Sequence, residues 1–201
     1  MNKERMVAFS DGVFAVIITI MVLDLKAPET PTLAALRGVL APFAAYVLSF
    51  LYVAIYWNNH HHLLQITRHI NGRVMWANMN LLFWASLIPF TTRWLDSAWL
   101  SDVHHPEIPV VFYGLSLLFT ALSYFLLQNM LVRLHGKDSA LGRAFARDFK
   151  GPASLVLYIV AIASALWNPA ISLVIYLVVA TLWFIPDRRI EGVLGEAEHG
   201  N

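Results

Sequence analysis

Apolar residues follow one another along the chain in long runs that are separated by short polar breaks. A helix needs about 20 residues to cross a hydrocarbon core of about 30 Å, so runs of that length bounded by charge, proline or glycine predict spans. The pattern predicts an all-α integral membrane protein with six transmembrane helices, at residues 6–25, 38–64, 74–92, 109–132, 152–167 and 170–185. The fifth of these runs, 152–167, is barely long enough to cross the membrane.

Prolines and short polar segments set the ends of these predicted helices. Pro28 and Pro31 follow the first run and cannot continue its hydrogen-bond ladder. A turn at 71–73 separates the second helix from the third, and a break at 168–169 makes the fifth and sixth helices a tight hairpin. Pro89 is expected to kink the third helix near its outer end.

Basic residues are divided unevenly between the two sides of this six-helix arrangement. Lysine and arginine collect in the short cytoplasmic loops of membrane proteins. With the N-terminus inside, eleven basic residues fall on the cytoplasmic side and three outside, so both termini are predicted to be cytoplasmic. The inner set is Lys3, Arg5, Arg68, Arg73, Arg133, Lys137, Arg143, Arg147, Lys150, Arg188 and Arg189, and the outer set is Lys26, Arg37 and Arg93.

The composition agrees with a membrane setting and with a single domain. Hydrophobic residues make up 58% of the 201 residues and charged residues 13%, against roughly 45–50% and 25% in an average soluble domain. No internal repeat or separate soluble domain is visible in the sequence. We expect one transmembrane domain over residues 1–187, followed by a short polar tail at 188–201.

The same composition excludes several kinds of chemistry. The chain has no cysteine, which removes disulfides, thiolate metal sites and cysteine nucleophiles. The formal net charge is +1 and no basic run is present, so a nucleic-acid partner is not expected. Nothing outside the membrane is large enough for catalysis, so the sequence predicts no enzyme and no catalytic residues.

The first predicted helix is unusual because it carries Arg5, Ser10 and Asp11 at its cytoplasmic end. A carboxylate at mid-membrane costs roughly 2.5–3.5 kcal/mol, so Asp11 is expected to face protein or water. Arg5 and Asp11 are six positions apart, which is not the spacing of side chains that meet on one helix. Their partners are therefore expected on other helices, among Trp57, Asn58, Asn59, His60, His61, His62, Asn78 and Asn80.

Farther along the first helix, Val16, Ile20 and Leu23 follow the i, i+4, i+7 pattern of one helical face, with Thr19 beside them. Such a face is suited to line a narrow pore. It is equally suited to pack against neighbouring helices or lipid, and periodicity alone favours packing. The sequence contains no T-V-G-Y-G-like stretch and no arginine at every third position, so any ion selectivity must come from side chains.

Three consecutive histidines, His60, His61 and His62, suggest a metal or haem site, since imidazole is a common ligand. Consecutive residues on a helix point about 100° apart, so no single site can use all three. No H-E-x-x-H or comparable spacing supplies further ligands. We expect hydrogen-bonding or interfacial histidines, and neither a metal nor a cofactor.

The segment R-M-V-A-F-S-D at residues 5–11 matches the R-x-x-x-F-S-D signature of the transmembrane protein 175 family, the endolysosomal potassium channels and their prokaryotic relatives. The continuation at 12–19 resembles the first helix of that family. Trp57 with His60 and His61 resembles its second helix. The resemblance extends over the whole six-helix pattern.

The resemblance implies a potassium-permeable cation channel that assembles as a homotetramer of single-repeat chains. In that family the first helices line the central pore, and bulky apolar side chains close it in place of a carbonyl filter. These positions correspond to Val16, Ile20 and Leu23, and Thr19 corresponds to a threonine layer linked to potassium preference. Valine at 16 is smaller than the family's usual isoleucine or leucine, so the tightest constriction is expected at Ile20 or Leu23.

The resemblance further implies a structural role for the signature residues. Arg5 and Asp11 would hold the first helix by hydrogen bonds to Ser10, to His60 or His61, and to Asn78. The implied partners are potassium ions, the lipid bilayer and other copies of the chain. A single-repeat chain without targeting signals suits a prokaryotic cell (inner) membrane. The implied motif network consists of Arg5, Phe9, Ser10, Asp11, Trp57, His60, His61 and Asn78.

Three other functions stay open at the level of sequence. A proton- or ion-coupled secondary transporter could use Asp11 and the histidines as a relay, although the paired repeats and broken helices typical of transporters are not visible. A membrane enzyme could place a metal on the histidine cluster. A structural or assembly protein is the remaining alternative.

Overall fold

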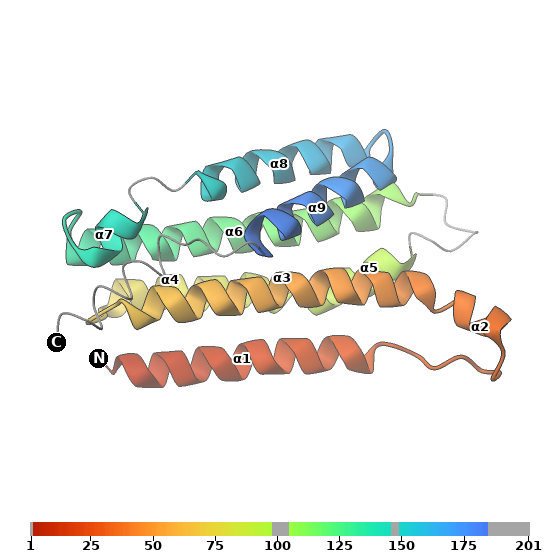
Figure 1. The fold of residues 1–201 in the computed structure, drawn as a ribbon, viewed down its shortest axis with the longest axis horizontal. Coiled ribbons are helices and arrows are strands. Elements are labelled where there is room, and N and C mark those ends of the chain that lie inside the picture. The colour runs from red at the N-terminus through yellow and green to blue at the C-terminus, as the bar shows by residue number, and fades with distance from the viewer. Residues whose placement is uncertain (1, 98–104, 146–148, 185–201) are drawn as a thin grey trace.

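The computed structural model describes residues 2–97, 105–145 and 149–184, and over these ranges every regular element is a helix. The helices form an elongated bundle in which α1 lies along one edge and α8 with α9 along the opposite one (Figure 1). The all-α fold class is therefore confirmed for the described residues. The elements are α1 (Lys3–Leu23), α2 (Leu33–Arg37), α3 (Leu40–Gln65), α4 (Gly72–Ala85), α5 (Ile88–Ser97), α6 (Glu107–His135), α7 (Ala140–Phe145), α8 (Lys150–Ala165) and α9 (Pro169–Phe184).

The apolar runs of the sequence reappear as helices with shifted ends. Among the described residues, α1, α3 and α6 are long and apolar enough to cross a membrane, and α8 and α9 are shorter apolar helices. α1 ends at Leu23 rather than at residue 25, with Asp24 as its C-terminal cap. The last residue of the predicted sixth helix and the predicted polar tail at 188–201 lie outside the described residues.

The predicted third helix, 74–92, is interrupted. α4 ends at Ala85 and α5 begins at Ile88, so two residues, Ser86 and Leu87, lie between them in a turn. Pro89 has no N–H to donate to Ala85, and its ring crowds the carbonyl four residues earlier. The helix is therefore disturbed just before Pro89, and the result is a break between α4 and α5 instead of the predicted kink.

Two short helices were not predicted. α2 follows the first span and begins at Thr32, whose side chain accepts a hydrogen bond from the backbone N–H of Ala35. α7 follows α6 after Gly136, which has a φ of +90°. Both are too short to carry a recognisable apolar period.

Buried tyrosines fill the centre of the bundle. Tyr52, Tyr113, Tyr158 and Tyr176 are among its largest fully buried side chains. Their hydroxyls have partners: that of Tyr52 donates to the carbonyl of Tyr176 over 2.6 Å, and that of Tyr113 is hydrogen-bonded to Oγ of Ser49 at 3.0 Å. A polar group in lipid has no water with which to form hydrogen bonds, so these hydrogen bonds between helices hold α3, α6 and α9 together.

The predicted hairpin of the fifth and sixth helices is confirmed by the pairing of α8 with α9. Oγ of Ser172 donates to the carbonyl of Ala161 over 2.7 Å and lies 3.0 Å from Oγ of Ser164. Gly114 of α6 lets Tyr176 of α9 approach, because a Cβ at this position would overlap its hydroxyl. Small residues at such contacts are typical of helix packing in membranes.

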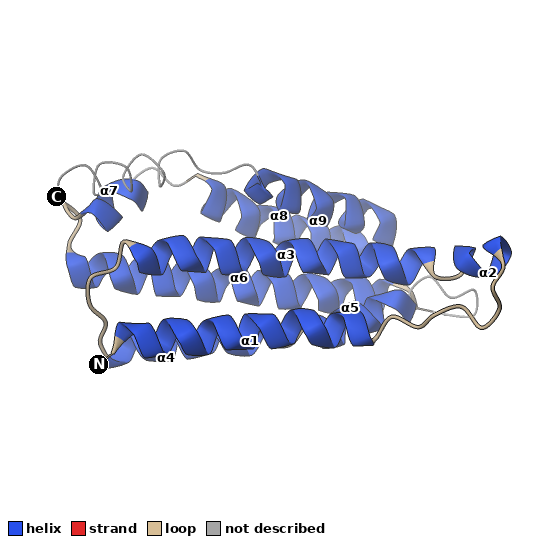
Figure 2. Cartoon of the chain, turned by 60° about the horizontal axis from the view of Figure 1, so that its bottom comes forward, coloured by secondary structure: helices blue, strands red, loops and turns tan. Residues whose placement is uncertain are grey.

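The ends of the helices place the basic residues at two opposite ends of the bundle. The start of α1, the end of α3, the start of α4, the end of α6 and α7 share one end, whereas α2 and α5 lie at the other (Figures 1 and 2). The first end carries the predicted inner residues Lys3, Arg5, Arg68, Arg73, Arg133, Lys137 and Arg143, and the second carries Lys26, Arg37 and Arg93. Lys150, the remaining described member of the inner set, begins α8, and Arg147, Arg188 and Arg189 lie outside the described residues.

Candidate functional site

The first helix has one buried face and one exposed face. Met6, Ser10, Phe14, Ile17 and Met21 are buried, and α1 packs against α3, α4 and α5. These positions recur every three to four residues, as one helical face does. A single chain therefore covers only one side of α1.

The opposite face of α1 carries the residues that the sequence singled out as a possible pore lining. Val16 is 55% exposed, Ile20 45% and Leu23 81%, and Thr19 is also exposed. The Oγ1 of Thr19 donates to the carbonyl of Val16 over 2.9 Å, which leaves the hydroxyl oxygen free to accept. The described helices of the same chain leave much of this face uncovered, so lipid, water or another copy can contact it.

The buried face is fixed by a polar network across three helices. Nδ2 of Asn78 on α4 donates to Oγ of Ser10 on α1 over 3.0 Å, and the same hydroxyl donates to the carbonyl of Met6 over 2.8 Å. Oδ1 of Asn78 then accepts from Nε2 of His60 on α3 over 2.7 Å. Ser10, His60 and Asn78 have no solvent exposure. The edge of the Phe14 ring closes the network over His60, with ring centroids 5.7 Å apart.

A second link between α1 and α3 lies at the edge of this network. Nε1 of Trp57 donates to Oδ1 of Asp11 over 2.9 Å. The indole also stacks on the imidazole of His61, with ring centroids 5.8 Å apart. Asp11 thus pairs with a residue on another helix, as expected, but its partner is Trp57 and not Ser10, His60, His61 or Asn78.

Two signature residues stand apart from the network. Arg5 is exposed, and its guanidinium makes no hydrogen bond or ion pair with any residue that the structure describes. Phe9 is exposed as well. The expected hydrogen bonds from Arg5 to Ser10, the histidines or Asn78 are therefore absent within the described part of one chain, because Arg5 lies outside the buried face of α1.

Lys3 makes a contact with the end of α3 that the sequence did not reveal. Its Nζ donates to the carbonyl of Leu64 over 3.1 Å and to that of Thr67 over 2.7 Å, at the end of α3. Free carbonyls at a helix C-terminus attract a cation. In the sequence Lys3 entered only the count of cytoplasmic charge, and its sole signal was its place at the start of the first helix.

The other end of α1 carries an ion pair. Nη1 of Arg93 on α5 lies 3.2 Å from Oδ1 of Asp24, which caps α1. One turn from Arg93, Asp96 has a buried Oδ1 with no hydrogen-bond partner.

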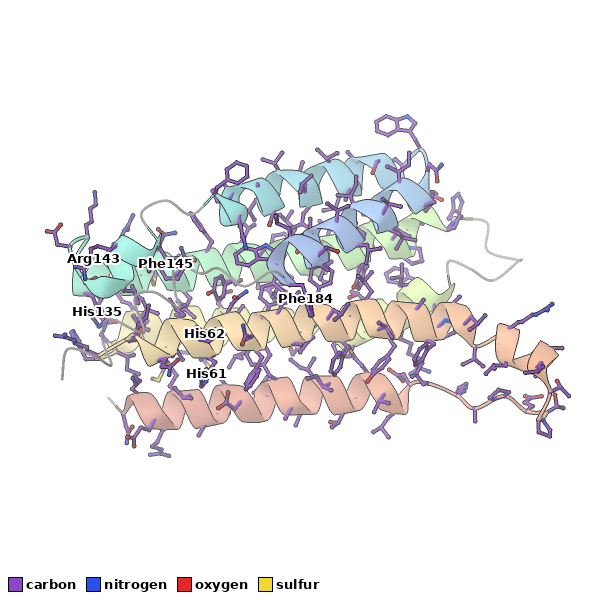
Figure 3. All side chains as sticks on the ribbon, viewed as in Figure 1. His61, His62, His135, Arg143, Phe145 and Phe184 are labelled. Atoms are coloured by element: carbon purple, nitrogen blue, oxygen red, sulfur yellow. The ribbon has the colours of Figure 1, made fainter. Side chains whose placement is uncertain are left out.

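The three histidines point to different surroundings. His60 faces Asn78, and His61 stacks on Trp57. The rings of His61 and His62 meet edge to face, with their centroids 5.7 Å apart. Figure 3 shows His61 and His62 on α3, well separated from His135 at the end of α6. Within the described ranges, no group of three or more histidine, aspartate or glutamate side chains is arranged to hold a metal ion.

Comparison with known proteins identifies the family. The family model described as "Endosomal/lysosomal potassium channel TMEM175" matches residues 5–89, which contain the whole polar network. A protein of Chryseobacterium sp. (strain P1-3) named a potassium channel is 46% identical to the chain over 196 residues, which covers 98% of this chain and 100% of that protein. The chain belongs to the TMEM175 family.

A solved TMEM175 structure has the same fold. The crystal structure of a lysosomal potassium-selective channel TMEM175 homolog from Chamaesiphon minutus superposes with a TM-score of 0.76 at 24% identity, and covers 91% of this chain and 96% of that chain. More distantly, the mouse TMEM175, named an endosomal/lysosomal proton channel, is 26% identical over 54% of this chain and 21% of its own length.

Membership of the TMEM175 family fixes the broad class of the protein. Its apolar helices and its relatives make it an integral membrane protein. These relatives are ion channels and not enzymes, in agreement with the sequence-based expectation. The signature segment 5–11 opens the matched region and supplies the α1 half of the polar network.

Proposed function

We propose that this protein is a potassium-permeable cation channel whose pore is lined by α1. The observation that carries the proposal is the division of α1 into two faces. One face is locked to α3 and α4 by Ser10, His60 and Asn78, and the other presents Val16, Ile20 and Leu23 outside the chain. A relative that matches the full chain is named a potassium channel, which supports the choice of ion.

The pore forms when four copies bring their α1 helices around a common axis. Val16, Ile20 and Leu23 then make rings of apolar side chains that close the path by excluding water. The Thr19 hydroxyl, which donates along its own helix, offers an oxygen to a partly dehydrated cation. Arg5 and Phe9, which have free faces in a single chain, contact the neighbouring copy.

The topology that supports this channel has six spans and both termini in the cytoplasm. α1, α3, α6, α8 and α9 each contribute one span, and α4 with α5 together contribute the third in sequence. The gathering of basic residues at the end of the bundle that holds the N-terminus supports this orientation. The full-length relative is bacterial, which supports placement in a prokaryotic cell membrane.

The polar network positions the pore helix and does not contact the ion. Ser10 lies on the buried face of α1, where Asn78 of α4 links it to His60 of α3, whereas Val16 and Ile20 of α1 are exposed. The pair of Asp11 with Trp57 holds the flank of the same helix. Loss of these contacts would therefore tilt or release α1 before it changes the chemistry of the pore.

The test is a bilayer recording with a matched control. Reversal potentials are measured with potassium on one side and sodium on the other for the wild type, Ile20→Asn and Ile171→Asn. Ile171 on α9 is 49% exposed, close to the 45% of Ile20, so both changes place an amide on an exposed apolar position. We expect potassium-directed unitary currents that change in Ile20→Asn only. If all three proteins form intact oligomers with the same currents and reversal potentials, α1 does not line the pore.

A second recording separates potassium from protons as the permeant ion. The mouse relative is named a proton channel, so a pH gradient is applied at equal potassium on both sides. A reversal potential that stays at zero despite the pH gradient supports the proposal, whereas one that follows the pH gradient would make protons the permeant ion. Flux strictly coupled to a counter-ion would instead support a transporter.

A further inference from the structure

The segment 66–71 links α3 to α4 at the end of the bundle where α1 begins (Figure 2). It has no helical ladder of its own, so its backbone polar groups need partners from elsewhere. Two side chains from distant parts of the chain supply them. Lys3 reaches it from the start of α1, and His135 reaches it from the end of α6.

On the first side, Lys3 binds the carbonyl groups where α3 ends. Its Nζ lies 2.7 Å from the carbonyl oxygen of Thr67 and 3.1 Å from that of Leu64. Thr67 is itself buried, and its hydroxyl donates to the carbonyl of Leu63 over 2.8 Å. The acceptor end of this contact is therefore rigid, and the start of α1 takes its position from the linker.

On the second side, His135 accepts two backbone hydrogen bonds from the same linker. Its Nε2 lies 3.3 Å from the backbone nitrogen of Arg68 and 3.4 Å from that of His69. Its Nδ1 lies 2.9 Å from the carbonyl oxygen of Leu131. Backbone N–H groups can only donate and a carbonyl can only accept. The imidazole of His135 is therefore neutral here, with its proton on Nδ1.

We propose that Lys3 and His135 clamp the 66–71 linker from two sides and so position the cytoplasmic end of the pore helix, and that protonation of His135 opens this clamp. Lys3 acts as a positioning residue through the linker. The consequence for conduction rests on the channel function proposed above, whereas the clamp itself does not.

Protonation opens the clamp because of what faces Nε2. A second proton turns Nε2 from an acceptor into a donor that points at two other donors. The charges around it are also unfavourable. The centroids of the His69 and His135 rings are 4.6 Å apart, and Arg68, Arg133, Lys137 and Arg143 lie in or beside the helix ends that meet there. Asp138 is the nearby acid in sequence, but no carboxylate of the described residues is within ion-pairing distance of His135.

The sign of the effect follows from this geometry. The clamp forms with the neutral imidazole only, so a second proton on His135 breaks it. Cytoplasmic acidification therefore frees the linker, and with it the anchor of α1.

Hydrogen exchange of the full-length protein, read by mass spectrometry, tests the clamp directly. After correction for the intrinsic pH dependence of exchange, we expect the amides of Arg68 and His69 to lose about fivefold to tenfold protection between about pH 7.5 and pH 5.5. In His135→Gln, which keeps an acceptor but cannot titrate, protection should not depend on pH. His69→Gln should behave as the wild type, because the accepting ring is still present.

The other side of the clamp is tested at Lys3. Lys3→Met should speed exchange in the linker and in the first turn of α1 at both pH values, and Lys3→Arg, which keeps a donor, should restore protection. Wild-type protection that ignores pH, or pH dependence that persists in His135→Gln, would overturn the proposal.

Single-channel recording separates this proposal from the channel proposal. Acidification of the cytoplasmic side should change the open probability of the wild type and leave His135→Gln unaffected. The expected exchange pattern without currents in any variant would support the clamp and overturn the channel function. Currents that respond equally in both proteins would overturn the link between clamp and pore.

Discussion

The indole nitrogen of Trp57 lies 2.9 Å from a carboxylate oxygen of Asp11, and this contact joins two helices at positions 46 residues apart in the sequence. It gives the single acidic residue inside α1 beyond its first turn a hydrogen-bond donor. A carboxylate within a membrane helix requires such a partner. The S-D part of the signature, Ser10 and Asp11, therefore has a structural role that is visible within one chain.

Trp57→Phe should destabilise the protein by about 0.5–1.5 kcal/mol, because Asp11 loses its donor while most of the aromatic packing is kept. Thermal unfolding in detergent measures the change. The matched control is Trp76→Phe, at an exposed tryptophan on α4 whose indole makes no hydrogen bond with any described residue. A control as unstable as Trp57→Phe would show that indole size matters and the hydrogen bond does not.

Asn78→Leu should cost more than Asn80→Leu. Asn78 joins Ser10 and His60 where neither is exposed, so its loss leaves Nε2 of His60 without its acceptor and Oγ of Ser10 without its donor, at about 1–3 kcal/mol. Asn80, on the same helix, makes one side-chain hydrogen bond within the described part of the chain, to Ser123 over 2.7 Å. Denaturation of both variants under one condition compares them. The reverse order would contradict the central place of Asn78.

Gly114→Ala should destabilise by about 1–3 kcal/mol through overpacking. The new methyl group overlaps the Tyr176 hydroxyl, which donates to the carbonyl of Val110 over 3.2 Å. Gly12→Ala is the control, since a Cβ there meets no atom within 4 Å. The control should be neutral or slightly stabilising, because alanine favours a helix more than glycine does. Equal melting temperatures for the two variants would contradict this account.

Asp96→Asn should make the protein more stable at neutral pH. Oδ1 of Asp96 is buried and has no hydrogen-bond partner among the described residues, and a neutral amide costs less to bury than a carboxylate. Thermal unfolding of the two proteins in detergent measures the change. A variant less stable than the wild type would contradict this account.

The sequence predicted the helices well because apolar length alone specifies a span. It placed the effect of Pro89 correctly within the third run but expected a kink, whereas the loss of a donor to Ala85 separates α4 from α5. It identified Ser10, His60 and Asn78 as members of one network. It did not predict which pairs would form, since pairing across helices depends on their rotation and register.

Two residues show what the sequence pattern could not supply. Lys3 was read as a topology signal, although the structure makes it a ligand of the α3 carbonyls. Arg5 was expected inside the network, yet its position on the exposed side of α1 leaves it without a partner in the described part of one chain. The rotation of α1 about its own axis decides both outcomes.

The turn at Ser86 and Leu87 between α4 and α5 bears on how α1 is held. Lys3 joins the start of α1 to the linker that leads into α4, and Asp24 joins the end of α1 to Arg93 of α5. One anchor therefore lies before α4 and the other on α5, and the turn at Ser86 and Leu87 separates these two helices. In the pore proposed above, bending at the turn between α4 and α5 would tilt α1 and so change the width of the path at Ile20 and Leu23.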